Sequence, residues 1–147
     1  MKYQSNCYVV GNEVLEFARN IGVSDLSEKL RGTEYRGIFK RRNYFVLDNN
    51  YLVVKVSRSK IRTVWGIGKQ FVDIFNLFTK ESGNFFVVTL VSNRSGWVFS
   101  KREVNNYIKD GSWSYSENQK QYKINDYNLK DKNSFTSIDA FLTKIRK

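Results

Sequence analysis

Apolar residues near the start of the chain recur every three or four positions, a spacing that predicts an amphipathic α-helix. The apolar face of this helix consists of Val14, Phe17, Ala18 and Ile21. Asn12 can accept hydrogen bonds from the first free backbone N–H groups, and Gly22 can adopt the left-handed conformation that often ends a helix. We therefore expect a helix between Asn12 and Gly22, with Glu16 on its polar side.

Aromatic and β-branched residues dominate the next part of the chain and predict three β-strands, at residues 35–40, 43–47 and 51–58. Asp48, Asn49 and Asn50 separate the second strand from the third. Asp and Asn tolerate positive φ and hydrogen-bond their own backbone, so this segment predicts a hairpin turn.

A helical spacing returns at residues 66–80, which places Ile67, Phe71, Ile74 and Phe78 on one face. The opposite face carries Lys69, Asp73 and Asn76. Residues 85–91 then form a nearly continuous apolar run, which is typical of a strand covered on both faces. We expect this strand to lie at the centre of the sheet.

The last third of the chain predicts shorter elements. Ser95 and Gly96 indicate a turn into a strand at residues 97–99, and Ser100 with Glu103 has the spacing of a capping box that opens a short helix. Two strands are predicted at residues 112–116 and 121–124, and a closing helix begins at Ser137. The whole pattern predicts one α+β domain over residues 1–147, with a central mixed sheet of about four to six strands flanked by helices and the core order α-β-β-β-α-β.

Composition excludes several kinds of chemistry. The chain contains no histidine and a single cysteine, Cys7, which excludes intrachain disulfides, Ser-His-Asp triads and histidine-containing zinc sites. No phosphate-binding glycine loop is present. The N-terminus is polar and no apolar run approaches the ~20 residues of a membrane span. We therefore expect a cytoplasmic protein that does not bind membranes.

Positive charge is concentrated in the middle of the chain. The net charge is +11, and residues 36–69, the basic window, hold nine basic residues against one acidic residue, Asp48. The bases are Arg36, Lys40, Arg41, Arg42, Lys55, Arg58, Lys60, Arg62 and Lys69. Clustered Lys and Arg displace the counterions condensed on a phosphate backbone, so nucleic acid is the expected partner, DNA rather than RNA.

Residues 42–60 read RNYFVLDNNYLVVKVSRSK. Together with the order helix, three strands, helix, strand, this hairpin resembles the PD-(D/E)XK, or restriction-endonuclease-like, nucleases over roughly residues 11–92. In that family an acidic residue on the second strand and an acidic-x-Lys pair on the third hold a divalent metal. The resemblance implies a nuclease-like fold whose active-site motif is degenerate here.

The motif can be placed in two ways. With Lys55 as the motif lysine, Val53 takes the acidic position and Asp48 is the nearest acid on the second strand. With the frame moved by two residues, Lys55 takes the acidic position and Asn43 that of the metal-binding aspartate. A valine cannot bind a hard cation, so a Mg²⁺ or Mn²⁺ site needs a further carboxylate.

The resemblance therefore implies Asp48, Lys55 and Glu16 as the catalytic candidates, with Asp48 and Glu16 holding the metal and Glu34 as a substitute for Glu16. Each residue also has an ordinary structural explanation: Asp48 forms a turn, Lys55 lies on a sheet surface and Glu16 lies on a solvated helix face.

The expected nucleic-acid contacts combine the bases of the window other than Lys55 with two further residues. Trp65 follows the basic strand and is a candidate for stacking on an unpaired base. Gln70 occupies a position where some members of the nuclease family carry a substrate-positioning glutamine.

We thus expect a nucleic-acid-binding protein with an inactive site. The alternatives are a Mg²⁺-dependent endonuclease of restriction or phage type and a basic inhibitor that docks on an acidic protein partner. A homodimer also stays open.

Overall fold

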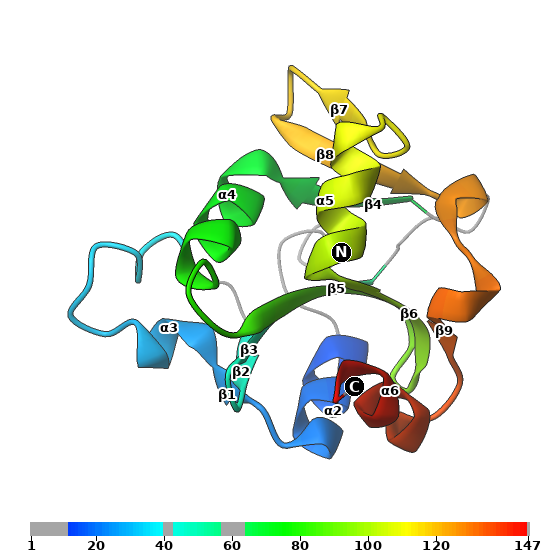
Figure 1. Ribbon diagram of the computed structural model, residues 1–147. Helices are drawn as coiled ribbons and strands as arrows, with labels where there is room; N and C mark the ends of the chain where they lie inside the picture. The colour runs from blue at the N-terminus through cyan, green and yellow to red at the C-terminus, as the bar shows by residue number, and fades with distance from the viewer. Residues whose placement is uncertain (1–11, 40–42, 57–63, 147) are drawn as a thin grey trace, which may run out of the picture.

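A computed structural model describes residues 12–39, 43–56 and 64–146. These residues form two sheets and five α-helices (Figure 1). The larger sheet has six strands in the order β1-β2-β3-β5-β6-β9, and the smaller has three in the order β4-β8-β7. The predicted α+β class is confirmed.

The helices and strands have the following bounds. The larger sheet contains β1 (Ser24–Asp25), β2 (Tyr44–Leu47), β3 (Asn50–Val56), β5 (Asn84–Ser92), β6 (Ser95–Ser100) and β9 (Ser134–Phe135). The smaller sheet contains β4 (Val64–Gly68), β7 (Ser114–Ser116) and β8 (Gln121–Asn125). The α-helices are α2 (Asn12–Ile21), α3 (Leu26–Lys29), α4 (Lys69–Phe78), α5 (Lys101–Lys109) and α6 (Ile138–Ile145). Two 3₁₀ turns, η1 (Asp126–Asn128) and η2 (Asp131–Asn133), join β8 to β9.

The larger sheet is mixed, because β3 pairs antiparallel with β2 and parallel with β5. Leu47 pairs with Asn50, so the hairpin loop consists of Asp48 and Asn49 alone. Asp48 adopts a φ of 56°, which Asp accepts more readily than most residues. The predicted hairpin is therefore confirmed.

Strand β5 lies between β3 and β6 and is covered on both faces, as its apolar run predicted. Phe85 and Val87 belong to the core on one face of the sheet, and Phe86 and Val88 belong to the core on the other. This alternation is the consequence of the two-residue period of a strand.

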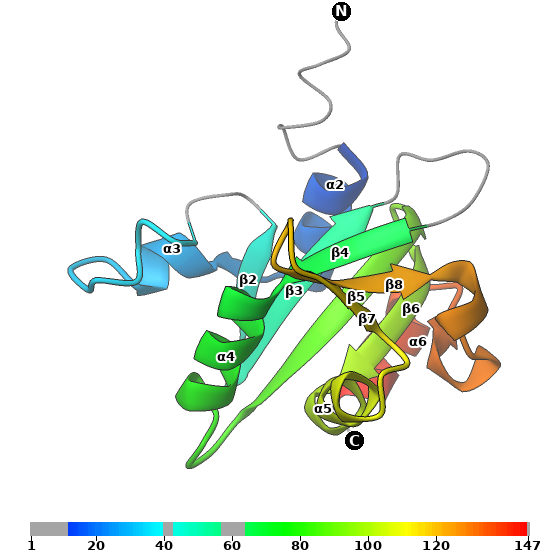
Figure 2. The ribbon, with the colours of Figure 1, turned by 90° about the horizontal axis from the view of Figure 1, so that it is seen from above.

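The two faces of the larger sheet are covered differently. Helices α2 and α6 cover one face, whereas α4, α5 and the smaller sheet cover the other (Figure 1). Seen from above, β4 and β8 lie across the larger sheet (Figure 2). The predicted apolar face of the first helix is buried, and Gly22 ends that helix with a φ of 70°.

The predicted strand at residues 35–40 is wrong over residues 35–39, the part that the structure describes. These residues form turns, with Ile38 N–H donating to the Tyr35 carbonyl at 3.0 Å and Phe39 N–H donating to the Arg36 carbonyl at 3.2 Å. The aromatic residue that suggested a strand, Phe39, is buried against Tyr44 and Phe75. Packing of rings, rather than strand pairing, accounts for the pattern.

The predicted helix at residues 66–80 begins three residues later than expected, at Lys69. Residues Gly66, Ile67 and Gly68 instead pair with β8. Their partners lie more than fifty residues further along the chain, so a local pattern cannot reveal this pairing. The core order also changes. The unpredicted β1 and α3 stand between α2 and β2, and β4 of the smaller sheet stands between β3 and α4.

The later elements agree with expectation except for the turn predicted at Ser95 and Gly96, which lies two residues earlier, since both residues already belong to β6. Ser100 and Glu103 form a complete capping box at the start of α5, and the Ser137 hydroxyl caps α6. Strands β7 and β8 lie within or close to the two predicted runs. Among the helices that the structure describes, none combines the length and the apolar character that crossing a bilayer requires.

Candidate nucleic-acid interface

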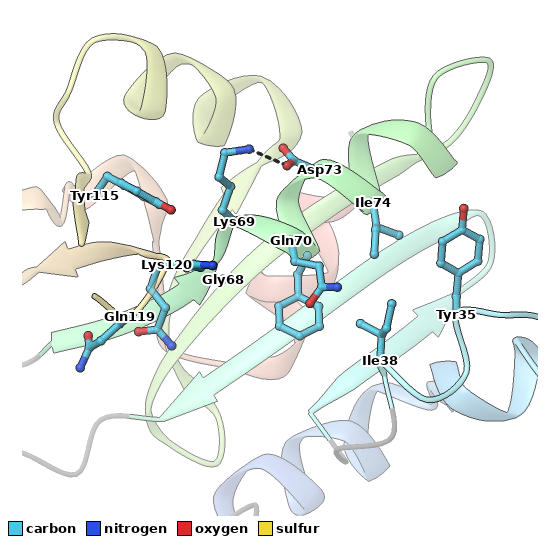
Figure 3. Close-up of a pocket in the computed structure, with 12 residues that line it drawn as sticks. Tyr35, Ile38, Gly68, Lys69, Gln70, Asp73, Ile74, Tyr115, Gln119 and Lys120 are labelled. Carbon is cyan, nitrogen blue, oxygen red and sulfur yellow. Dashed lines mark hydrogen bonds and ion pairs between the residues drawn. The ribbon is translucent and has the colours of Figure 1, made fainter. Parts of the chain in front are cut away.

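A groove of about 760 Å³ lies between the β7–β8 hairpin and the turn at residues 35–38, with the first turns of α4 between them (Figure 3). Tyr115, Gln119 and Lys120 come from the hairpin. Lys69 and Gln70 come from the start of α4. On the side of the turn stand Tyr35, Ile38 and Ile74. We call this feature the α4 groove.

Antiparallel pairing between β4 and β8 positions the groove. Gly68, the last residue of β4, pairs with Gln121, the first residue of β8. One residue further on, the Lys69 N–H donates to the Lys120 carbonyl at 3.0 Å. Lys120 has a φ of 52°, and this conformation lets the hairpin reverse beside the start of α4. The helix start and the hairpin are therefore held together by backbone bonds.

The two groove lysines differ in their electrostatic surroundings. Lys69 Nζ donates to Asp73 Oδ2 at 2.7 Å, one helical turn away. That hydrogen bond and the charge of Asp73 raise the pKa of Lys69. Lys120 is exposed and makes no ion pair with any residue that the structure describes. Its full charge is available to a ligand.

Two tyrosines lie close together on the hairpin. The rings of Tyr115 and Tyr122 are 5.2 Å apart, and Tyr115 remains 39% exposed. Burial raises the pKa of the Tyr122 phenol, and the nearby charge of Lys69 partly offsets this effect. Tyr122 packs against the core and so anchors the hairpin, while Tyr115 presents an aromatic surface at the groove (Figure 3).

The structure brings some of the predicted nucleic-acid contacts to the groove. Lys69 and Gln70 line it, and Arg36 belongs to the turn that supplies Tyr35 and Ile38. Arg36 is exposed and lies 3.8 Å from a carboxylate oxygen of Glu28. The predicted contacts Lys40, Arg41, Arg42, Arg58, Lys60 and Arg62 lie outside the described residues.

Trp65 does not have the exposure that stacking on a base requires. It is only 2% exposed, and its ring meets Trp97 edge to face at 6.0 Å. Placement in β4 turns this side chain into the core between the two sheets. The aromatic side chains that line the groove are instead Tyr35, Phe71 and Tyr115. Two short strand patterns predicted the hairpin of Tyr115, but nothing in them indicated a site.

The catalytic candidates do not converge. Asp48 precedes β3, whereas Lys55 lies near its far end, about 16 Å further along the strand. Leu52 and Val54 pack on the α2 side of the sheet, so Lys55 lies on the opposite face from the helix that carries Glu16. Glu34 is exposed in the turn that precedes the groove. In the part of the chain that the structure describes, no group of three or more Asp, Glu or Cys residues is arranged to hold a metal ion.

Comparisons with known proteins do not assign this chain to a family. No protein-family model matches the chain, and no curated protein or solved structure shows significant similarity to it. The resemblance to the PD-(D/E)XK nucleases therefore stays a prediction.

Proposed function

We propose that this protein binds nucleic acid through the α4 groove and the basic window, without cleaving it. The observation that carries the proposal is that Lys69, at one end of the basic window, lines the groove, and that Arg36, at the other end, lies in the turn whose Tyr35 and Ile38 line it. Arg36 lies in the turn that supplies one side, and Lys69 begins the helix beside the hairpin. A phosphate backbone is the polyanion that such a surface suits best, because neutralising it releases condensed counterions.

Binding is favoured over cleavage by the placement of the acidic residues. Two-metal or one-metal hydrolysis needs carboxylates that point to a common centre. Asp48 and Lys55 lie at opposite ends of β3, and Glu16 lies on a helix that covers the other face of the sheet. The degenerate motif predicted from the sequence agrees with this separation.

Nucleic-acid binding is tested by measuring fluorescence anisotropy of labelled DNA and RNA with the purified protein, in EDTA and again in Mg²⁺. We expect binding that needs no metal and weakens steeply with salt. If about five phosphates are neutralised, the slope of log K against log salt is near −4.5. Intact oligonucleotide after incubation with Mg²⁺ or Mn²⁺ is expected on a denaturing gel.

Two results would overturn the proposal in different directions. Metal-dependent cleavage that disappears in Lys55→Ala would identify an endonuclease with an irregular site. Absence of binding to DNA and RNA even at low salt would leave the basic surface to an acidic protein partner.

A further inference from the structure

We propose that the α4 groove takes an unpaired base, so that the protein prefers single-stranded nucleic acid to duplex. This inference rests on the proposed function and specifies its substrate. In a duplex the base faces are stacked on one another, whereas an unpaired strand can turn its bases into a protein pocket. A convex charged surface would bind both substrates through their phosphates. A hollow with an apolar surface the size of a base would favour the single strand.

The α4 groove is such a hollow. Its volume of about 760 Å³ lies within the range of about 300–1,000 Å³ that is typical of small-molecule pockets. Ile38, Phe71 and Ile74 provide apolar surface on the side of the turn and the helix. Across the groove, Tyr115 presents a ring that is 39% exposed. Aromatic rings of this kind stack on bases of any sequence, because every base has a π-face.

The polar groups of the groove suit the remaining parts of a nucleotide. Gln70 and Gln119 are exposed, and their side-chain amides make no hydrogen bond within the described part of the chain. An amide carries both a donor and an acceptor, as the edge of a base does. Lys120 has a free charge for a phosphate, whereas the charge of Lys69 is shared with Asp73. In the proposed complex the base stacks on Tyr115, its edge faces the amides of Gln70 and Gln119, and its phosphate lies at Lys120.

The first measurement compares affinities of the wild-type protein for a labelled oligodeoxythymidine and for a blunt-ended duplex of equal length, in the same buffer with EDTA. We expect the single strand to bind at least about tenfold more tightly. Only an unpaired base can stack on Tyr115, and one such contact contributes a factor of this order to affinity. Equal affinities would refute the unpaired-base inference and leave nucleic-acid binding intact. No binding to either substrate would refute both proposals.

Variants then assign the preference to the groove. Tyr115→Ala is expected to weaken single-strand binding about fivefold or more and to leave duplex binding unchanged. Tyr115 also contacts Tyr122, so its effect on the fold is checked by circular dichroism and thermal unfolding. Gln70→Ala is the second test, because the side chain of this exposed residue makes no hydrogen bond that the structure describes, and the substitution should reduce the same preference.

The contribution of charge is tested with Lys120→Asn, because Asn tolerates the φ of 52° at this position better than Ala does. We expect weaker binding to the single strand and a shallower salt slope. The matched control is Lys130→Asn, at an exposed lysine outside the groove. If Lys130→Asn and Lys120→Asn reduce affinity equally, or if neither Tyr115→Ala nor Gln70→Ala changes the preference, the groove is not the base site.

Discussion

The backbone N–H of Lys69 donates a hydrogen bond to the carbonyl of Lys120, with 3.0 Å between nitrogen and oxygen. This bond joins the first residue of α4 to the reversal of the β7–β8 hairpin, and so it holds one side of the groove against the helix start. It depends on the left-handed conformation of Lys120, whose φ is 52°.

The left-handed conformation of Lys120 leads to a prediction about stability. Lys120→Val places a β-branched side chain at positive φ, and we expect the free energy of unfolding to fall by about 1–2 kcal/mol. Lys120→Gly removes the steric conflict and should leave stability unchanged or raise it slightly. Urea unfolding of both variants tests the difference. Equal stabilities for Val and Gly would show that the turn is not strained by a side chain at this position.

Asp73 is the one carboxylate among the groove-lining residues that the structure describes. Asp73→Asn removes its charge and releases Lys69 from the ion pair. We expect affinity for single-stranded DNA to rise about two- to fivefold at low salt, because an additional cation faces the phosphates. The control is Asp139→Asn, an exposed aspartate in the first turn of α6. An equal rise in both variants would indicate a general charge effect without a role for the groove.

Gly96 allows two strands of the larger sheet to approach closely. A Cβ atom at this position would lie 2.0 Å from the carbonyl oxygen of Thr89 and 2.9 Å from the Cα of Leu90. Because both neighbours are backbone atoms of the central strand, they cannot move aside. Gly96→Ala should therefore lower the free energy of unfolding by about 2–4 kcal/mol or prevent folding.

Gly37→Ala is the matched control for this glycine, since an added Cβ there has no neighbour within 4 Å. We expect a change below about 0.5 kcal/mol. Chemical denaturation measures both variants, and a similar loss in both would contradict the role assigned to strand approach at Gly96.

Glu103 makes a prediction for pH. Burial alone would raise the pKa of its carboxyl group, but hydrogen bonds from the Ser100 N–H, from Asn133 and from the Ser100 hydroxyl, together with the charge of Lys132, lower it overall. A folded-state pKa below the unfolded value stabilises the fold above about pH 4.5, and this contribution is lost as the pH falls through the folded-state pKa.

Glu103→Gln should therefore be less stable than the wild type near neutral pH and should lose less stability on acidification. Thermal unfolding from about pH 7 down to about pH 3 measures this difference. Glu81→Gln, at an exposed glutamate outside the network, is expected to follow the wild type. Parallel pH profiles for the wild type and Glu103→Gln would contradict the assigned hydrogen bonds.

Several elements could be predicted because their signals are local. In α2, the four apolar residues and Gly22 lie within one short segment, and the structure buries the four and ends the helix at Gly22. The capping box of Ser100 and Glu103 and the reversal at Asp48 depend on residues no more than three positions apart. The continuous apolar run of β5 also predicted its central place, since only a strand covered on both faces is apolar throughout.

The groove depended on long-range pairing that no local pattern contains. Gly66, Ile67 and Gly68 continue a helical spacing, yet pairing with β8 makes them a strand, because the ladder hydrogen bonds and the burial of Ile67 in the core outweigh local propensity. The same pairing buries Trp65, a candidate for base stacking, and places Tyr115 at the groove instead. The local sequence therefore determined α2, α5, α6 and the hairpin turn, whereas long-range strand pairing decided where α4 begins and which aromatic and basic side chains meet at one surface.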